Sequence, residues 1–289
     1  MQYDKLLVIG NGFDLALGLK TSYPDFMEWL KNVHYMDDAY LYKFLRSKLD
    51  QQRWIDIENE LRQYSLSFSE IGEMNIKLSN QNEQMYNSLR NEHKTLCKNL
   101  CEYLKIQVDK KDWLETSRKN NSIRQLLKKV NGVPLYVINF NYTQTIFKIE
   151  SFPIKSMKQI HGSLDNGENI VFGVEDSSNL TKEHSFLYKS YNPTLNVDHL
   201  NERFEDAKHI LFYGYSLGQA DHSYFEDFFK EQSTKGCERK KFDFFYYGQE
   251  GYDDLFWQLR TLTGNRMAQF KQFNDVEFID TNNNSCFTE

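Results

Sequence analysis

The chain has 289 residues, of which 40% are hydrophobic and 15% aromatic, and its formal net charge at pH 7 is −6. This apolar content excludes a mainly disordered chain, and the negative charge argues against broad, non-specific nucleic-acid binding, which usually needs a basic face. Because no apolar run reaches the length of a transmembrane helix and no signal-peptide pattern opens the chain, we expect a cytoplasmic protein that does not enter a membrane.

The first predicted element is a short buried strand over residues 5–9, which ends in the glycine turn Gly10-Asn11-Gly12. Two glycines let the backbone take positive φ angles and let a ligand approach the amides closely. A helix start comes next, over residues 13–17, and its N-terminal amides would face an anion. The glycine pair alone fits an ordinary strand exit equally well, so the interpretation as a phosphate site depends on motifs further along the chain.

Two carboxylates stand near this turn. Ser22 predicts the N-cap of a helix that runs to about Val33, and Asp25 suits the first turn of that helix, while Asp14 suits a cap of the glycine turn. The alternative to these capping roles is a catalytic role. If the ligand is a nucleoside, one of them could stabilise the oxocarbenium-like state that forms when an N-glycosidic bond breaks.

From residue 35 to residue 133 the pattern is helical, with few glycines and prolines and many charged residues. Strand and helix then alternate. Apolar strands are predicted at 135–140, 170–173, 209–214, 242–247 and 276–279, with helices near 196–207, 222–231 and 252–262. This alternation predicts an α/β domain, built from residues 1–34 and 134–289, whose mostly parallel sheet has helices on both faces. Residues 35–133 are then a helical insertion after the first strand.

Polar residues follow two of the predicted strand-like segments. Asn141 comes directly after strand 135–140, where an amide can satisfy loop backbone groups, hold a ribose hydroxyl or position a water molecule. His161 precedes Gly162, whose small size permits close ligand approach, and a histidine here suits a general base near neutral pH. Ligands bind outside the carboxyl ends of strands in such sheets.

Residues 214–218 read Gly-Tyr-Ser-Leu-Gly, which also fits the nucleophile elbow of α/β-hydrolases with Ser216 as nucleophile. His222 is the one histidine after Ser216 and stands too close for the usual order of a catalytic triad. Asp221 is the expected N-cap of the next helix. A serine hydrolase is therefore the weaker alternative.

Two resemblances rest on these motifs. Gly10-Asn11-Gly12-Phe13-Asp14, with Thr21-Ser22-Tyr23-Pro24-Asp25-Phe26, resembles the AbiH family, which is implicated in bacterial abortive infection against phage. The spaced set of Gly-x-Gly, Pro-Asp-Phe, Asn, His-Gly and Gly-x-Ser-Leu is similar to the nucleotide-binding core of the sirtuin-like superfamily. That core has a Rossmann-like fold and binds NAD.

The resemblance implies NAD as ligand or substrate, and it implies roles for residues at the matching positions. The implied catalytic residues are Asn141, His161 and Asp25, and the implied cofactor-binding residues are Gly10, Asn11, Gly12, Asp14, Phe26, Gly214 and Ser216. Two positions depart from the sirtuin pattern, since Thr143 replaces an Asp and Met27 replaces an Arg. The four cysteines form no Cys-x-x-Cys pair, so the zinc module is missing, no metal is expected, and protein deacetylation is disfavoured.

We therefore expect a phage-defence protein that hydrolyses the nicotinamide–ribose bond of NAD. The alternative is a non-enzymatic nucleotide sensor that signals through its helical insertion. A homo-oligomer or a phage-derived trigger is a possible partner in either case. Residues 54–58, Trp-Ile-Asp-Ile-Glu, look like the AbiH pattern. Two interpretations stay open for this segment: Asp56 and Glu60 share a solvated helix face, or Asp56 or Glu58 reaches over the ligand pocket.

Overall fold

The computed structural model describes residues 4–32, 39–49, 60–61, 79–113, 115, 120–130, 132–164 and 170–282. The chain divides into two compact units. The first comprises Met1–Leu19, Lys111–Ile160 and Asn196–Glu289, and the second comprises Lys20–Lys110 and His161–Leu195. The predicted Asp56 and Glu58 lie outside the described residues.

The first unit is built on one six-stranded sheet in the order β3-β2-β1-β4-β5-β6, and every neighbouring pair is parallel. The strands are β1 (Lys5–Ile9), β2 (Leu135–Asn139), β3 (Ile154–Gln159), β4 (His209–Tyr213), β5 (Lys241–Tyr246) and β6 (Asp275–Asp280). Central strands such as β2 are buried on both faces, which explains their continuous apolar sequences. This strand order is that of the Rossmann fold, so the predicted fold class is confirmed.

Helices α1 (Asn11–Ala16) and α7 (Asn121–Val130) cover one face of the sheet. Alternate residues of the strands point to this face and form one buried cluster with Phe13 of α1 and Leu126 of α7. Helix α7 falls inside the predicted insertion, yet its apolar side chains pack against β1 and β2. The 3-10 helix η2 (Thr145–Lys148) contributes Ile146 to the same cluster.

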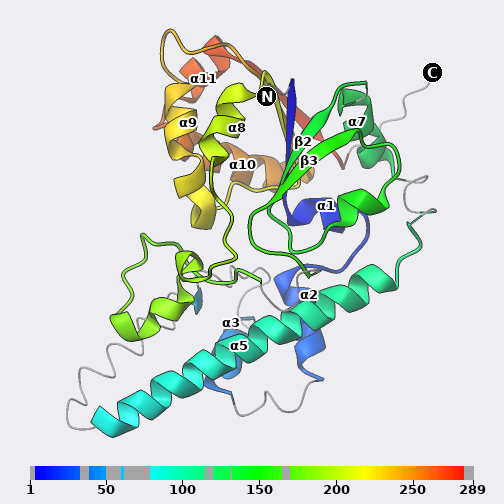
Figure 1. The fold of residues 1–289 in the computed structure, drawn as a ribbon. Coiled ribbons are helices and arrows are strands. Elements are labelled where there is room, and N and C mark those ends of the chain that lie inside the picture. Colours follow the sequence, from blue (N-terminus) through cyan, green and yellow to red (C-terminus); the bar gives the residue numbers. More distant parts are fainter. Residues whose placement is uncertain are drawn as a thin grey trace. The chain divides into compact units, whose positions relative to one another are not determined.

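The opposite face carries α8 (Leu200–Asp206), α9 (Glu226–Glu231), α10 (Gly248–Leu262) and α11 (Met267–Phe273), as Figure 1 shows in yellow to orange. Phenylalanines dominate the packing here. Phe204 of α8 stacks on Phe212 of β4, and Phe270 of α11 lies 4.9 Å from Phe242 of β5, centroid to centroid. Aromatic side chains bury large areas, so these rings supply much of the hydrophobic stabilisation of this face.

The second unit contains α2 (Tyr23–Leu30), α3 (Tyr40–Leu49) and the long helix α5 (Ser79–Asp109), with the 3-10 helices η4 (Lys182–Leu187) and η5 (Lys189–Tyr191). Helix α5 packs against α2, α3 and η4. Its His93 donates a hydrogen bond from Nε2 to the Phe172 carbonyl at 2.9 Å and stacks on the Phe172 ring. Burial lowers the pKa of His93 to about 4, so this histidine is neutral at pH 7.

Three sequence predictions need correction. Residues 170–173 are not a strand of the sheet, because Ile170 forms a single antiparallel bridge with Gly162 in the second unit. The third strand is β3, at the edge of the sheet. The helix expected at 196–207 begins only at Leu200, and the helix expected at 222–231 is divided into the 3-10 helix η6 (Gln219–Tyr224) and α9.

Among the described residues, no helix combines the length and the apolar character that crossing a membrane requires.

Candidate functional site

The carboxyl ends of β1 and β4 meet at the point where the strand order reverses, which is the ligand-binding position in doubly wound sheets. The loops that leave these strands pack directly on each other. Gly12 donates its amide hydrogen to the Gly214 carbonyl at 2.7 Å, and Gly10 donates to the Tyr213 carbonyl at 3.3 Å. A Cβ on Gly12 would lie 2.5 Å from the Gly214 Cα, and Gly214 itself has φ near +60°. These glycines are thus required by the contact between the two loops.

Asp14 is buried below this contact, with 1% of its surface exposed. Its two carboxylate oxygens accept hydrogen bonds from the hydroxyls of Thr143 and Thr145, both at 2.5 Å. Burial raises the pKa of Asp14 to about 6, although both hydroxyl bonds act to lower that pKa. The carboxylate joins α1 to the loop after β2, and its oxygens are engaged within the protein.

A second polar network fixes the same loop from the other side. Asn139, the last residue of β2, donates from Nδ2 to the Thr143 carbonyl at 2.8 Å and to Gln159 Oε1 at 3.0 Å, and its Oδ1 accepts the Asn141 amide hydrogen at 2.9 Å. Gln159 donates in turn to the Asn141 carbonyl. The backbone of Asn141 is therefore held at both its amide and its carbonyl.

The side chain of Asn141 differs from its neighbours. The residue is 7% exposed, and its Nδ2 has no hydrogen-bond partner among the described residues. A buried amide without a partner costs about 1–3 kcal/mol, and such a group in a native fold calls for a ligand or an ordered water molecule. Among the described residues of this edge, Asn141 thus has a buried side-chain donor to offer a ligand.

The loop after β4 carries the motif that includes Ser216. Tyr215 is buried, stacks on Phe140 at 4.3 Å between ring centroids, and donates its hydroxyl to Asp221 at 2.7 Å. This bond occupies Asp221, and the residue that caps α9 is Phe225, so the prediction of Asp221 as N-cap is wrong. Ser216 is exposed on the loop.

The contacts of His222 bear on the serine-hydrolase alternative. The Nε2 atom of His222 contacts the Leu217 carbonyl at 3.1 Å and Gln258 Oε1 at 2.8 Å. A general base for Ser216 would need its ring nitrogen directed at the serine hydroxyl. The contacts of His222 therefore disfavour this alternative.

Three predicted site residues belong to the second unit. Asp25 donates its amide hydrogen to Ser22 Oγ at 3.2 Å, and its carboxylate accepts the Ser22 hydroxyl at 2.5 Å, so the pair forms the N-terminal cap of α2. Phe26 is buried against Trp29 and Tyr103. His161 is buried, and its carbonyl accepts the Val171 amide hydrogen at 2.8 Å.

The structure therefore places Gly10, Asn11, Gly12, Asp14, Asn141, Gly214 and Ser216 in the first unit and Asp25, Phe26 and His161 in the second. Sequence reasoning missed the parts that Thr145 and Gln159 play. Gln159 is the last residue of β3, and Thr145 begins η2 in the loop after β2, so the available signal was a polar residue at a strand end and another in the loop after a strand. No set of three or more His, Cys, Asp or Glu side chains in the described part of the chain is arranged to hold a metal ion.

A family model described as "Bacteriophage abortive infection AbiH" matches residues 6–243, which span β1 to β5. No curated protein matches the chain.

Proposed function

Since the chain belongs to the AbiH family of bacteriophage abortive infection proteins, we propose that it acts by binding NAD and hydrolysing its nicotinamide–ribose bond. Loss of NAD would arrest metabolism in the infected cell and so limit phage multiplication. The sirtuin-like resemblance of the spaced motifs supplies the choice of NAD, and the Rossmann strand order is compatible with a dinucleotide.

The observation that carries the proposal is the buried Nδ2 of Asn141, which has no hydrogen-bond partner in the part of the chain that the structure describes. It belongs to the loop after β2, next to β1 in the sheet, and two hydrogen-bond networks fix the backbone of that loop. Such preorganisation is what a group needs if it is to orient a ribose hydroxyl or a water molecule. The residues at this edge therefore fit a nucleotide, with Asn141 as the group that holds the ribose.

The reaction balances without a further reagent. Water adds to the ribose C1′, the bond from C1′ to the pyridinium nitrogen breaks, and nicotinamide leaves as a neutral molecule because the ring nitrogen takes the bonding electron pair. The proton of the water passes to a base, for which the sirtuin-like resemblance designates His161. A positioned general base contributes about 10²- to 10⁴-fold.

The phosphate groups need donors other than the two glycine amides, which already donate to the Tyr213 and Gly214 carbonyls. Ser216 is exposed in the loop after β4 and offers a hydroxyl. We therefore assign the phosphate contact to Ser216 in place of the Gly10 and Gly12 amides.

The experiment is incubation of the pure protein with NAD, with nicotinamide release followed by chromatography. The variants are Asn141→Ala and His161→Ala, and the control is Asn32→Ala, which removes an exposed amide just past the end of α2. Release by the wild type that falls at least 100-fold in His161→Ala and persists in Asn32→Ala supports the proposal. Equal release by wild type and His161→Ala removes that residue from the mechanism.

Binding measurements separate the enzyme from a sensor. If calorimetry detects NAD binding that Asn141→Ala abolishes, while no nicotinamide is released even with phage lysate added as a source of trigger, the protein is a nucleotide sensor. If neither binding nor release is detected under both conditions, the proposal of an NAD site fails.

A further inference from the structure

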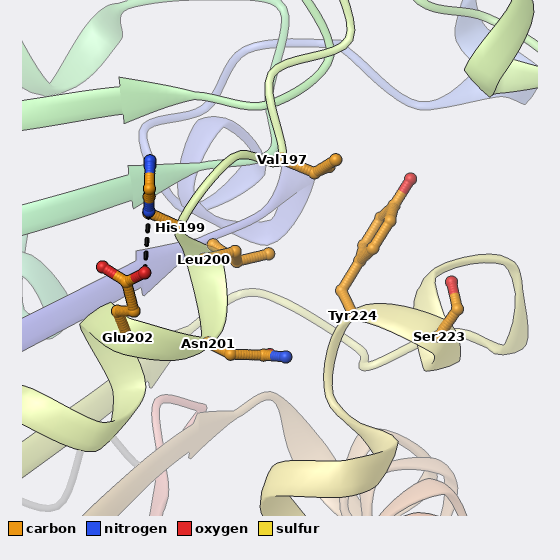
Figure 2. A pocket seen from close by; sticks show the side chains of 7 residues that line it. All are labelled: Val197, His199, Leu200, Asn201, Glu202, Ser223 and Tyr224. Atoms are coloured by element: carbon orange, nitrogen blue, oxygen red, sulfur yellow. Dashed lines mark hydrogen bonds and ion pairs between the residues drawn. The ribbon is translucent and has the colours of Figure 1, made fainter.

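The first unit has a cavity of about 360 Å³ between the start of α8 and the 3-10 helix η6. This volume is at the lower end of the range for small-molecule sites. Val197 and Leu200 form an apolar wall on one side, and the ring of Tyr224 stands across from them on the other (Figure 2). The lining thus offers an apolar surface and an aromatic face to one occupant.

The cavity borders the same edge of the sheet as Asn141. The amide hydrogen of Asn196 is donated to the carbonyl of Ile160, just past β3, at 3.1 Å, which holds the segment before α8 at the carboxyl end of that strand. On the other wall, the Tyr224 ring lies 6.2 Å from the ring of Phe140, centroid to centroid. Phe140 is the residue between the end of β2 and Asn141.

An aromatic cluster supports Tyr224 from behind. Its ring contacts Phe225 at 6.5 Å and Phe140, and Phe140 in turn stacks on Tyr215. This packing restrains the Tyr224 ring. A restrained ring opposite an apolar wall suits the insertion of a flat aromatic group, as in base stacking on protein side chains.

The polar side chains of the cavity determine which flat aromatic group fits it best. Asn201 extends from α8 toward the base of Tyr224 (Figure 2), and its amide offers one acceptor and two donors. Adenine presents the matching pair, the N6 amino group and N7, and asparagine pairs with adenine in this way. His199 Nδ1 and Glu202 Oε1 lie 2.7 Å apart and engage each other. None of the seven lining residues is Lys or Arg, so the lining favours a base over a phosphate group.

We propose that this cavity is the adenine subsite of the nucleotide site. The adenine ring stacks on Tyr224 against Val197 and Leu200, and its N6 amino group and N7 bond the Asn201 amide. The inference rests on the proposed binding of NAD and adds which half of the dinucleotide this cavity takes.

The test is calorimetric titration of the full chain with four probes: NAD, ADP-ribose, nicotinamide mononucleotide and the hypoxanthine analogue of NAD. In Asn201→Ala we expect NAD and ADP-ribose to bind about ten-fold more weakly, while nicotinamide mononucleotide is unaffected. The hypoxanthine analogue, which lacks the N6 amino group, should bind the wild type more weakly than NAD does and should lose less in the variant. Tyr224→Ala should weaken NAD binding by a similar factor, and Tyr224→Phe should restore it because the ring is kept.

Two results would overturn the inference while the proposed function stands: NAD binding that neither Asn201→Ala nor Tyr224→Ala changes, or an Asn201→Ala effect on nicotinamide mononucleotide, which would place the other base here. Absence of NAD binding in the wild type overturns the proposed function itself. Asn32→Ala serves as the control for removal of an amide, and thermal unfolding of each variant checks that the fold is retained.

Discussion

Asp14 is a carboxylate that the fold buries and then holds with two threonine hydroxyls. Its pKa of about 6 lies above the ordinary value of 3.8, so the folded state binds the proton more tightly than the unfolded chain does. The stability that protonation adds is full below pH 3.8 and is lost as the pH rises through 6. We expect the free energy of unfolding to contain a contribution of about 3 kcal/mol from this group, since one pKa unit corresponds to about 1.4 kcal/mol.

The measurement is denaturant unfolding of the wild type and of Asp14→Asn between pH 5 and pH 8. Asparagine keeps an acceptor for a threonine hydroxyl but cannot titrate. The difference in unfolding free energy between the two proteins should therefore change with pH, with the wild type gaining relative to the variant as the pH falls. A difference that stays constant across this range would show that Asp14 does not titrate there.

Gly12 leads to a second prediction at the residue scale. Gly12→Ala places a methyl group 2.5 Å from the Gly214 Cα, and overpacking of this kind typically costs about 1–3 kcal/mol. Gly251, inside α10, has open space beside its Cα, since nothing outside the neighbouring backbone of its own helix lies within 4 Å of the place that a methyl group would take. Gly251→Ala should therefore stabilise the protein by about 0.5–1 kcal/mol. The melting temperatures of both variants test these two predictions. Equal changes in melting temperature would contradict the tight contact between Gly12 and Gly214.

The sequence predicted candidate site residues in the first unit, but it did not predict what some of them contact. Asn141 was recognisable because a polar residue directly follows an apolar strand. The contact between Gly12 and Gly214 joins residues 202 positions apart, and no local pattern encodes such a pairing. The burial of Asp14 has the same origin, because the two threonines that bond it come from a distant loop.

At the scale of elements, substitutions in α7 test whether this helix packs on the sheet of the first unit. Leu126 is fully buried in the cluster with β1 and β2, whereas Leu127 is only partly buried beside it. Leu126→Ala should destabilise the protein by about 2–5 kcal/mol, the usual cost of a large-to-small change in a core, and Leu127→Ala should cost less. The denaturation midpoints of the two variants provide the measurement. A similar loss in both would mean that α7 does not pack on the sheet by its Leu126 face.

Five of the six strands were predictable, including β6, which is only partly buried and whose predicted bounds lie within one residue of those observed. Strands β1, β2, β4 and β5 are apolar runs, and their predicted bounds agree with the structure to within one residue. Strand β3 has the sequence Ile-Lys-Ser-Met-Lys-Gln and lies at the edge of the sheet, and this weak apolar pattern did not place it among the predicted strands. The apolar run at 170–173 looked more like a strand, but its side chains serve the core of the second unit.

At the scale of the molecule, the two units should respond to acid in opposite directions. Asp14 belongs to the first unit and His93 to the second. The pKa of His93 is lowered to about 4, so the stability it confers is present above its unfolded value of 6.5 and is lost as the pH falls toward 4. From pH 7 to pH 5 we expect the first unit to gain about 1 kcal/mol and the second to lose about 2 kcal/mol from these two groups.

Hydrogen exchange followed by mass spectrometry resolves the two units in one experiment, after correction for the intrinsic pH dependence of exchange. Protection of β1 and β2 should increase at pH 5, and protection of α5 around His93 should decrease. The variants Asp14→Asn and His93→Gln should each remove the change in their own unit. A shift of both units in the same direction that survives in these variants would assign the effect to other groups.

The interleaving of the two units along the chain also determines when the contact between the two loops can form during synthesis on the ribosome. Strand β1 emerges early, but β2 follows only after most of the second unit, and β4 only after the segment 161–195. Because domains fold as units when their parts are available, the contact of Gly12 with Gly214 cannot form until residue 214 has left the exit tunnel. A nascent chain released before that point lacks the paired loops. The proposed NAD-hydrolysing activity would therefore require chains that extend past residue 214, and shorter fragments would lack it.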